Sequence, residues 1–234
     1  NMIADIYAEQ FKIHILPERE TSYVTDGNEY ARWLGCSQQE DRLLTANSID
    51  LELTDWIVVD NYAVSKEWES FFVKKGIKVF VIDDLADRPH QCDLLLDQTF
   101  GRIVADYRNL ILPSSRLLVG AEYSLLRPEF SILRNNALSK RSKQKIGKIL
   151  ISLGGIDEHN VTERILNALN DLSLPNIELT VVLGKHGPWR KDITRLAEVM
   201  SMPTKILVNV REMALLMASS DFAIGAAGST TWER

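Results

Sequence analysis

Short apolar runs that alternate with amphipathic helical patterns restrict the fold of this chain more than any other feature. Runs of this kind are Trp56–Val59, Ile77–Ile82, Lys148–Leu153, Glu178–Leu183 and Phe222–Gly225, and the alternating segment Phe11–Leu16 predicts a further strand. A continuous apolar run is typical of a strand that is buried on both faces, and helices between such strands favour parallel pairing. The pattern therefore predicts an α/β fold with parallel sheets.

A change of composition near the middle of the chain marks a boundary between two domains. A short helical pattern, Glu129–Ala137, runs into Ser139–Lys145, a basic and polar segment that is typical of a solvated linker. We predict two Rossmann-like domains, at residues 1–134 and 147–234, joined by a linker at residues 135–146. Both domains are expected to be incomplete, because the first strand–loop–helix unit is missing and the chain stops about one turn into a helix.

Two turns of small residues indicate where an anion could bind. After the predicted strand that begins at Phe222, small residues up to Gly228 turn the chain, and Ser229 or Thr230 can cap the helix that Thr231 begins. Leu153–Gly155, with its Gly154-Gly155 pair, follows another predicted strand. Free N–H groups and the positive end of the dipole at a helix N-terminus attract phosphate, and glycine allows it to approach. Because α/β domains also contain purely structural turns of this kind, a phosphate site and a structural turn are both open.

The composition excludes several classes of partner and site. A net charge of −5 argues against nucleic acid and anionic membranes as partners, and no apolar run approaches the length of a membrane span. Cys36 and Cys92 are far apart, which indicates two reduced thiols in a cytoplasmic protein. The histidines are dispersed, at His14, His90, His159 and His186, so neither a metal nor another cofactor is expected. A monomer is compatible with the sequence.

Polar side chains follow two neighbouring predicted strands of the first domain. Asp60, Asn61 and Tyr62 come after one strand, and Asp83 and Asp84 come after the next. Ligands of open α/β sheets bind beyond the carboxyl ends of the strands, so these groups are candidates for binding a sugar. The alternatives are that the Asp83-Asp84 pair caps a turn and pairs with Arg88, and that Tyr62 is a core aromatic residue.

The last residues of the chain also allow two interpretations each. Glu233 follows the second small-residue turn, where a carboxylate can bind a ribose diol or complement the helix dipole. Trp232 fits a core position better than a platform for base stacking.

The segment Val81–Gln98, which reads VIDDLADRPHQCDLLLDQ, closely resembles a signature of a known family. That family is the UDP-2,4-diacetamido-2,4,6-trideoxy-β-L-altropyranose hydrolases of pseudaminic acid biosynthesis, often called PseG. Further segments that look like this family, in the same order, are Asp60–Tyr62, Gly120–Phe130, Ile151–Gly155 and Gly225–Glu233. The resemblance implies the GT-B architecture, two Rossmann-like domains with a cleft between them, similar to the glycosyltransferase MurG.

The resemblance also implies a reaction and roles for particular residues. Water releases UDP from C1 of a UDP-sugar substrate, with inversion and without a metal, and the general base is a histidine expected upstream of this chain. Tyr62 matches a tyrosine near the reacting sugar. The residues implied to bind UDP are Val210 at the uracil, Glu233 at the ribose and the turn Gly228, Ser229 and Thr230 at the diphosphate, to which the Gly154-Gly155 turn is added from the sequence. A MurG-like glycosyltransferase and an inactive nucleotide-sugar-binding remnant remain as alternatives.

Overall fold

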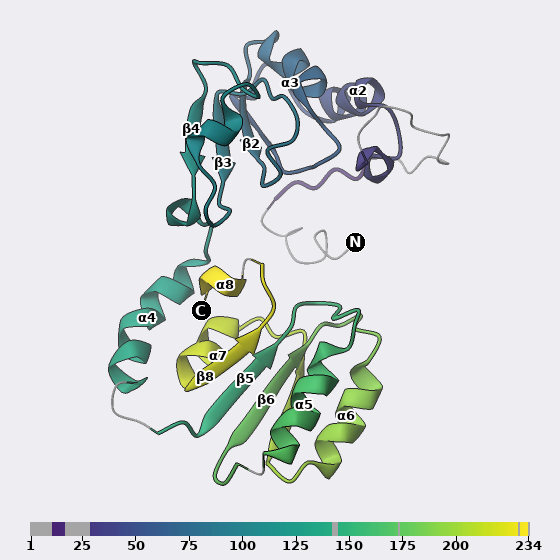
Figure 1. Ribbon diagram of the computed structural model, residues 1–234. Helices are drawn as coiled ribbons and strands as arrows, with labels where there is room; N and C mark the ends of the chain where they lie inside the picture. Colours follow the sequence, from purple (N-terminus) through teal and green to yellow (C-terminus); the bar gives the residue numbers. More distant parts are fainter. Residues whose placement is uncertain (1–10, 17–28, 142–144, 173, 229, 234) are drawn as a thin grey trace. The chain divides into compact units, whose positions relative to one another are not determined.

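The computed structural model describes residues 11–16, 29–141, 145–172, 174–228 and 230–233, without the side chain of Thr230. The chain divides into two compact units, Asn1–Tyr123 and Ser124–Arg234 (Figure 1).

The first unit contains a parallel sheet of four strands in the order β1-β2-β3-β4. The strands are β1 (Trp56–Val59), β2 (Lys78–Ile82), β3 (Leu94–Asp97) and β4 (Arg116–Val119). The helices are α2 (Gln38–Ser48) and α3 (Lys66–Val73), with 3₁₀ turns η1 (Ala31–Trp33), η2 (Val104–Tyr107) and η3 (Ala121–Tyr123). The register places Val59 beside Val81 and Ile82 beside Leu96, so the carboxyl ends of β1, β2 and β3 lie next to one another.

The core of the first unit lies where α3 packs against the sheet. Phe72 of α3 is fully buried with Val79, Val81 and Leu95 of the neighbouring strands. Burying a side chain of this size stabilises a fold by about 1.5–3 kcal/mol. Strands β2 and β3 occupy the two central positions of the sheet, and buried residues recur along both.

Strand β1 differs from the prediction of a strand buried on both faces. Trp56 and Val58 are 45% and 58% exposed, whereas Val59 is buried. Trp56 and Val58 lie two residues apart and so share one face of this edge strand, and that face is left open to solvent. The predicted strand at Phe11–Leu16 is also absent, since residues 12–16 have no assigned secondary structure.

The second unit contains another parallel sheet of four strands, in the order β7-β6-β5-β8. The strands are β5 (Lys148–Ser152), β6 (Glu178–Leu183), β7 (Thr204–Val208) and β8 (Phe222–Gly225). The helices are α4 (Pro128–Arg141), α5 (Val161–Asp171), α6 (Arg190–Val199), α7 (Met213–Ser219) and the short α8 (Thr230–Glu233). Two parallel sheets, each with accompanying helices, confirm the predicted class of two Rossmann-like units.

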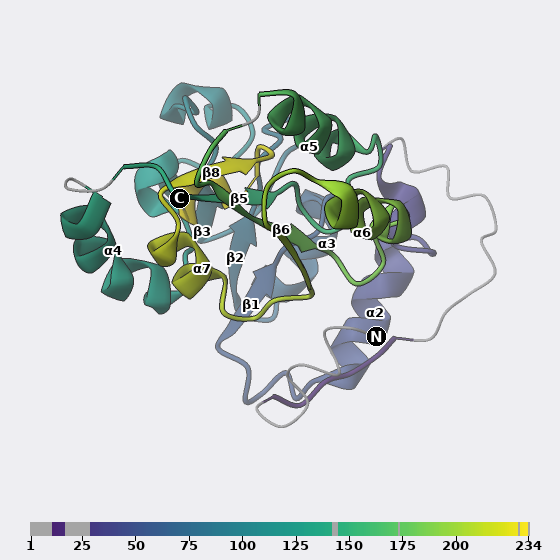
Figure 2. The ribbon, with the colours of Figure 1, turned by 90° about the horizontal axis from the view of Figure 1, so that it is seen from below.

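Alternation along β5 explains why helices cover both faces of this sheet. Ile149 and Ile151 pack with Leu166 of α5, and Leu150 packs on the opposite face with Phe130 of α4. Figure 2 shows α5 and α6 grouped together and α4 grouped with α7. A strand with apolar side chains on both faces is what the continuous run in the sequence requires.

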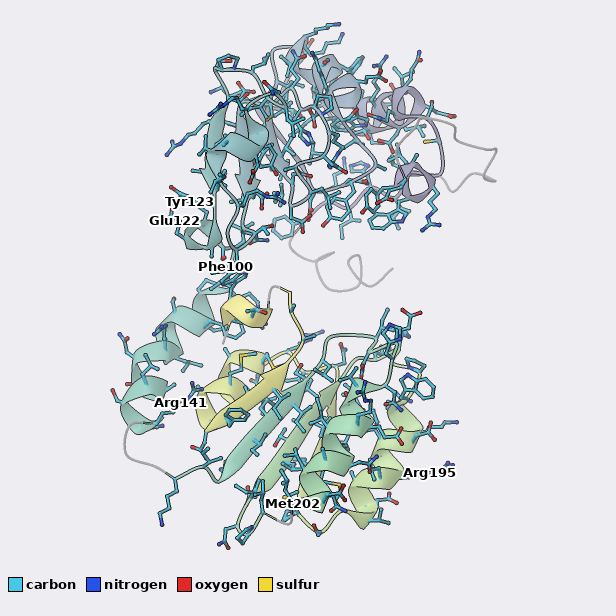
Figure 3. All side chains as sticks on the ribbon, viewed as in Figure 1. Phe100, Glu122, Tyr123, Arg141, Arg195 and Met202 are labelled. Atoms are coloured by element: carbon cyan, nitrogen blue, oxygen red, sulfur yellow. The ribbon has the colours of Figure 1, made fainter. Side chains whose placement is uncertain are left out.

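Helix α4 is longer than its sequence pattern predicts and occupies part of the predicted linker. Ala137 is buried, and Arg141, labelled in Figure 3, ends the helix. The Arg141 guanidinium donates a hydrogen bond to the carbonyl of Met217 in α7. Residues 135–141 are therefore helix that belongs to the second unit, which begins at Ser124. The remaining predicted linker includes residues 142–144, which lie outside the described residues.

Candidate functional site

The carboxyl ends of β2 and β3 carry two buried aspartates that share a phenol. Asp83 follows β2 and Asp97 ends β3, and both are at most 1% exposed. The Tyr107 hydroxyl lies 2.8 Å from Asp83 Oδ2 and 2.9 Å from Asp97 Oδ2. Burial and the hydrogen bonds to Asp83 and Asp97 raise the pKa of Tyr107. The phenol therefore stays protonated, and its hydroxyl donates its one hydrogen between the two carboxylates.

Asp83 is also the acceptor for a turn and for a buried arginine. Its Oδ2 accepts the Ala86 N–H at 3.0 Å, and its Oδ1 lies 2.8 Å from Arg88 Nη1. Burial alone would raise the pKa of Asp83, but the Ala86 amide, the Arg88 guanidinium and the Tyr107 hydroxyl together lower it. The structure thus shows Asp83 in the turn-capping and Arg88-pairing role that was one of its two interpretations.

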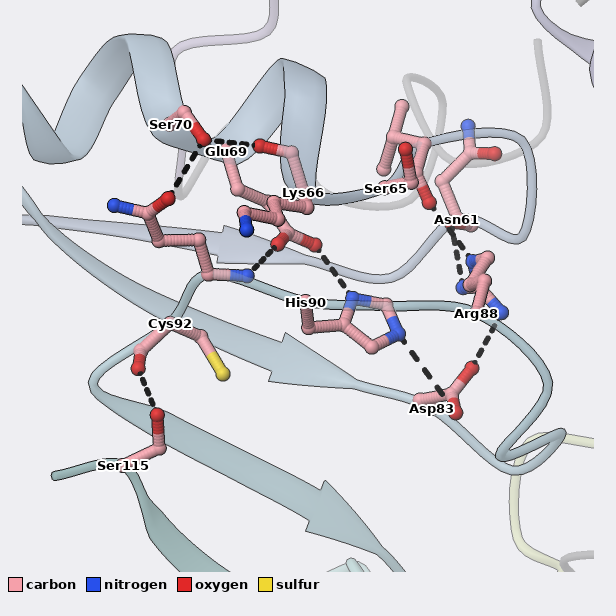
Figure 4. A network of polar contacts seen from close by, with 12 residues as sticks. Asn61, Ser65, Lys66, Glu69, Ser70, Asp83, Arg88, His90, Cys92 and Ser115 are labelled. Atoms are coloured by element: carbon pink, nitrogen blue, oxygen red, sulfur yellow. Dashed lines mark hydrogen bonds and ion pairs between the residues drawn. The ribbon is translucent and has the colours of Figure 1, made fainter. Parts of the chain in front are cut away.

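A buried glutamate–histidine pair approaches Asp83 from the side of α3 (Figure 4). His90 Nδ1 lies 2.6 Å from Glu69 Oε1, while Glu69 Oε2 accepts the Gln91 N–H. His90 Nε2 faces Asp83 Oδ2 at 3.9 Å, beyond hydrogen-bond distance. Both members are buried, so the pair fixes the Val81–Gln98 segment from inside and does not face a ligand.

Arg88 connects the loop after β1, which contains Tyr62, to the carboxyl end of β2 through hydrogen bonds. Its Nε donates to the Val64 carbonyl at 2.9 Å and its Nη2 to the Asn61 carbonyl at 3.5 Å. The guanidinium carbon lies 5.9 Å from the centre of the Tyr62 ring. The same arginine therefore holds both the Asp83 carboxylate and the loop after β1.

Tyr62 lies at this edge of the sheet as a partly buried, neutral phenol. Burial and a hydrogen bond to Asp84 raise the pKa of Tyr62, so it suits hydrogen-bond donation and not proton abstraction at neutral pH. Its ring contacts Tyr30 and Trp33, with centroids 5.2 and 5.6 Å away. The sequence did not reveal these two aromatic neighbours, which reach Tyr62 from residues before α2.

In the second unit, the Gly154-Gly155 turn is packed against the loop after β6. Gly154 has a φ of +86°, and a Cβ atom on Gly184 would lie only 1.8 Å from the Gly155 carbonyl oxygen. Glycine is therefore required at 184, which sequence reasoning did not single out. The small cavity that these residues line has a volume of about 10 Å³, near the lower limit for one water molecule.

The helix that follows this turn already has an acidic cap. The two Asp157 carboxylate oxygens accept the N–H groups of Val161 and Thr162, both at 2.9 Å. Burial acts to raise the pKa of Asp157, but these hydrogen bonds outweigh it and lower the pKa. A phosphate at this turn would have to use N–H groups of the glycine pair, and that role stays a prediction.

The second small-residue turn is described only in part. Gly228 has a φ of +137°, and its carbonyl accepts the Thr231 N–H at 2.9 Å. Ser229 lies outside the described residues, and Thr230 is the first residue of α8.

One arginine that the sequence did not single out connects two of the predicted UDP-binding positions. Arg127 Nη1 donates to the carbonyl of Arg211, the residue after Val210, and Arg127 Nη2 lies 3.9 Å from Glu233 Oε1. Glu129 is a second acidic partner of Arg127, at 3.2 Å. Val210 itself packs beside the cluster of Phe130 and its neighbours, so its side chain is structural and its backbone is the available part.

Trp232 and Glu233 line a groove on α4 and α7. The groove has a volume of about 210 Å³, and its other walls include Phe130, Arg134 and Met217. Trp232 is partly buried there. Across the described parts of both units, no three His, Cys, Asp or Glu residues are grouped to hold a metal, and none of the helices has the length and apolarity to cross a membrane.

Known proteins resemble this chain at low identity. It is 24% identical over 184 residues to the UDP-2,4-diacetamido-2,4,6-trideoxy-β-L-altropyranose hydrolase of Campylobacter jejuni, covering 78% of this chain and 63% of the hydrolase. It is 24% identical over 202 residues to an uncharacterized protein of Methanocaldococcus jannaschii, covering 85% of this chain and 41% of that protein. No protein-family model matches the chain.

Among solved structures, the crystal structure of Acinetobacter baumannii MurG aligns with a TM-score of 0.49 at 14% identity, covering 83% of this chain and 53% of MurG. The match to the hydrolase confirms the resemblance inferred from the sequence motifs. The chain spans less than two thirds of each curated relative that it matches.

Proposed function

We propose that this protein is a nucleotide-sugar hydrolase of pseudaminic acid biosynthesis, which releases UDP from C1 of a UDP-2,4-diacetamido-2,4,6-trideoxyhexose by inverting attack of water. The observation that carries the proposal is the match to a UDP-sugar hydrolase over 78% of the chain. The polar side chains at the carboxyl ends of β1 and β2 support it, because ligands of open α/β sheets bind at that edge.

In this proposal the second unit binds UDP through its backbone and one carboxylate. The backbone of Val210 contacts uracil, Glu233 accepts from the ribose hydroxyls, and the turn Gly228, Ser229 and Thr230 binds the diphosphate. The Gly154-Gly155 turn adds N–H donors. Donors directed at a leaving group offset the charge that develops on it as the bond to C1 breaks.

The first unit acts on the sugar, and Tyr62 is its proposed catalytic residue. A phenol whose pKa is raised remains a hydrogen-bond donor, and Arg88 and Asp84 restrict where it points. Replacing one such donor in other enzymes costs on the order of 10²-fold in kcat. Tyr62→Phe is therefore expected to lower kcat by roughly that factor and to leave UDP affinity unchanged, as measured by turnover and by calorimetry with UDP.

The proposed reaction is tested by incubating the full-length gene product with the purified UDP-sugar alone and following UDP release. In ¹⁸O-water, the label is expected in the sugar and not in UDP, and EDTA is expected to leave the rate unchanged. UDP release that requires an added acceptor would support a glycosyltransferase instead. Binding of UDP-sugars without any turnover would support the inactive remnant.

The ribose assignment is tested with a pair of variants on the same arginine. Glu233→Ala and Glu129→Ala each remove one acidic partner of Arg127, but only Glu233 is proposed to contact UDP. Losing hydrogen bonds to a charged group typically costs about 1.5–3 kcal/mol, or roughly 10- to 100-fold in Kd. UDP affinity should fall by that factor in Glu233→Ala and stay unchanged in Glu129→Ala; equal affinities would contradict the assignment.

A further inference from the structure

Three aromatic rings touch one another at the carboxyl end of β1. Tyr30 and Trp33 lie 5.0 Å apart, and Tyr62 lies 5.2 Å from Tyr30 and 5.6 Å from Trp33, in edge-on and tilted arrangements. The three residues come from the segments before α2 and after β1, which are separated by the whole of α2 in the sequence. The cluster of Tyr30, Trp33 and Tyr62 is called the aromatic trio below.

The aromatic trio is placed differently from the aromatic residues that build the core. Trp68 and Phe72 are at most 5% exposed, whereas Trp33 is 58% exposed. None of the trio belongs to the buried core cluster of the first unit. Tyr30 and Tyr62 are partly buried beside the exposed Trp33 ring. A single exposed apolar residue is ordinary, but adjoining aromatic rings that are open to solvent on one side are typical of the wall of a ligand site.

Carboxylates border the trio on the side of β2. Asp84 accepts a hydrogen bond from the Tyr62 hydroxyl, and a hydrogen bond with Glu29 raises the pKa of Tyr30, with smaller contributions from the charges of Asp87 and Asp84. Apolar ring faces beside a few fixed polar groups are the usual composition of a small-molecule site. A pyranose ring has the matching chemistry, since it carries C–H groups on its faces and hydroxyl or amide groups on its rim.

We propose that the aromatic trio is the surface on which the sugar ring of the UDP-sugar lies, and that it selects sugars rich in methyl groups. This inference rests on the proposed function and specifies its substrate recognition. A 2,4-diacetamido-2,4,6-trideoxyhexose presents three methyl groups, two from the acetamido groups and one at C6, that can pack on Trp33 and Tyr30. UDP-N-acetylglucosamine, with one methyl group and a hydroxylated C6, forms fewer such contacts. The carboxylates of Asp84 and Asp87 accept hydrogen bonds from the N–H groups of the two acetamido substituents.

The experiment compares two exposed tryptophans of the first unit, one in η1 and one in β1. Trp33 lies near the carboxyl end of β1, and Trp56 begins β1 at the opposite end, where it is 45% exposed and contacts Lys78. Trp33→Ala, Trp33→Phe and Trp56→Ala are made in the full-length gene product. For each variant, Kd is measured for UDP, for UDP-N-acetylglucosamine and for the UDP-diacetamido-trideoxyhexose, together with UDP release and the thermal unfolding midpoint.

A methyl group in an apolar site typically changes discrimination by about 10- to 200-fold. Trp33→Ala is therefore expected to weaken binding of the diacetamido sugar nucleotide by at least about 10-fold, to reduce its preference over UDP-N-acetylglucosamine and to leave UDP binding unchanged. Trp33→Phe should retain most of the preference, and Trp56→Ala should behave as wild type.

Three results overturn the inference in distinguishable ways. If the wild type releases UDP and Trp33→Ala keeps both its affinity and its preference, the trio is not the sugar surface and the proposed function stands. If the wild type neither binds nor cleaves either UDP-sugar, the proposed function fails and the inference fails with it. A loss of UDP affinity equal to the loss of sugar-nucleotide affinity would also contradict the inference, because it would show general damage to the fold.

Discussion

At the carboxyl end of its sheet the first unit is built from buried charged side chains, whereas the second unit is built from closely packed backbone. In the first unit, Asp83 pairs with Arg88, and Glu69 pairs with His90 beside them. In the second unit, Gly155 and Gly184 approach so closely that no side chain fits at residue 184. The first edge is therefore specified by charge and the second by volume, and the two should respond to different substitutions.

The difference also fits two kinds of ligand chemistry. Side chains held by ion pairs can present a defined hydrogen bond, as Tyr62 does beside Asp84. Backbone turns without Cβ atoms can present N–H groups to a phosphate, which needs several donors and no particular side chain. The four predictions below test the difference, from the largest expected effect to the smallest.

Asp83→Ala should be the most destabilising change, because it removes the buried carboxylate partner of Arg88 and leaves only the partly exposed Asp87 as an acidic partner. It also removes the acceptor of the Ala86 N–H and Tyr107 hydroxyl hydrogen bonds. Breaking a buried ion pair in this way costs about 3–5 kcal/mol. The free energy of unfolding from urea titration is the measurement, with the exposed Asp84→Ala as a control that should stay within about 0.5 kcal/mol of wild type.

The pH dependence of the same variant gives a second check. Because folding lowers the pKa of Asp83, its stabilisation is complete above its unfolded pKa of about 4 and is lost as the pH falls through the folded value. The difference in free energy of unfolding between wild type and Asp83→Ala should therefore decrease below about pH 4. A constant difference would mean that the ion pair is not the source of the stability.

Gly184→Ala should destabilise the second unit through volume alone. The new Cβ would overlap the Gly155 carbonyl, and overpacking of this kind costs about 1–3 kcal/mol. Gly187→Ala, in the same loop, meets no atom closer than 3.5 Å and is the matched control. Equal unfolding midpoints for the two variants would show that the Gly155–Gly184 approach relaxes at little cost.

Asp157→Asn should have a smaller effect, because asparagine keeps a side-chain acceptor and tolerates the positive φ of 47° at this position. The negative charge at the start of α5 and one of the two hydrogen bonds that Asp157 accepts are lost, which together are worth about 1–2 kcal/mol. Since folding lowers the pKa of Asp157, the difference from wild type should be present at pH 7 and should disappear as the pH falls below about 4. A difference that persists at pH 3 would contradict this.

The smallest effect concerns the thiols of the first unit and changes reactivity without changing stability. Burial and the nearby Glu69 carboxylate raise the pKa of Cys92 to about 12, whereas Cys36 is half-buried. A thiol reagent at pH 8 should label Cys36 in the native protein and Cys92 only after denaturation. Rapid native labelling of Cys92 would show that the buried network opens readily.

Much of the fold could be predicted from the sequence because the strands are uninterrupted apolar runs. The bounds of β6 and β8 coincide with the predicted Glu178–Leu183 and Phe222–Gly225. The extension of α4 could not be predicted, because Ser139–Arg141 are polar and the helix continues through contacts with α7 that are distant in sequence. The exposure of Trp56 likewise depends on which strands pair, and an apolar run does not specify that.

The candidate site shows the same limit. The Asp83–Arg88 pair lies within five residues, so it was among the alternatives read from the sequence. The Glu69–His90 pair joins a helix to a loop 21 residues away, and local spacing gives no signal for it. In the sequence Gly184 looks like any loop glycine. Glycine is required there because the backbone of Gly155 leaves no room for a side chain, and that contact cannot be read from local spacing.

The position of β5 has a consequence for how the protein is made. β5 pairs with β6 on one side and with β8 on the other, and Phe222 of β8 lies beside Ile149 of β5. On the ribosome, β5 emerges well before β8, since α5, β6, α6, β7 and α7 are synthesised between them. During that interval one edge of β5 lacks its native partner, and pairing across such a long stretch of chain is slow. The nascent second unit is thus the part of the molecule that we expect chaperones to protect.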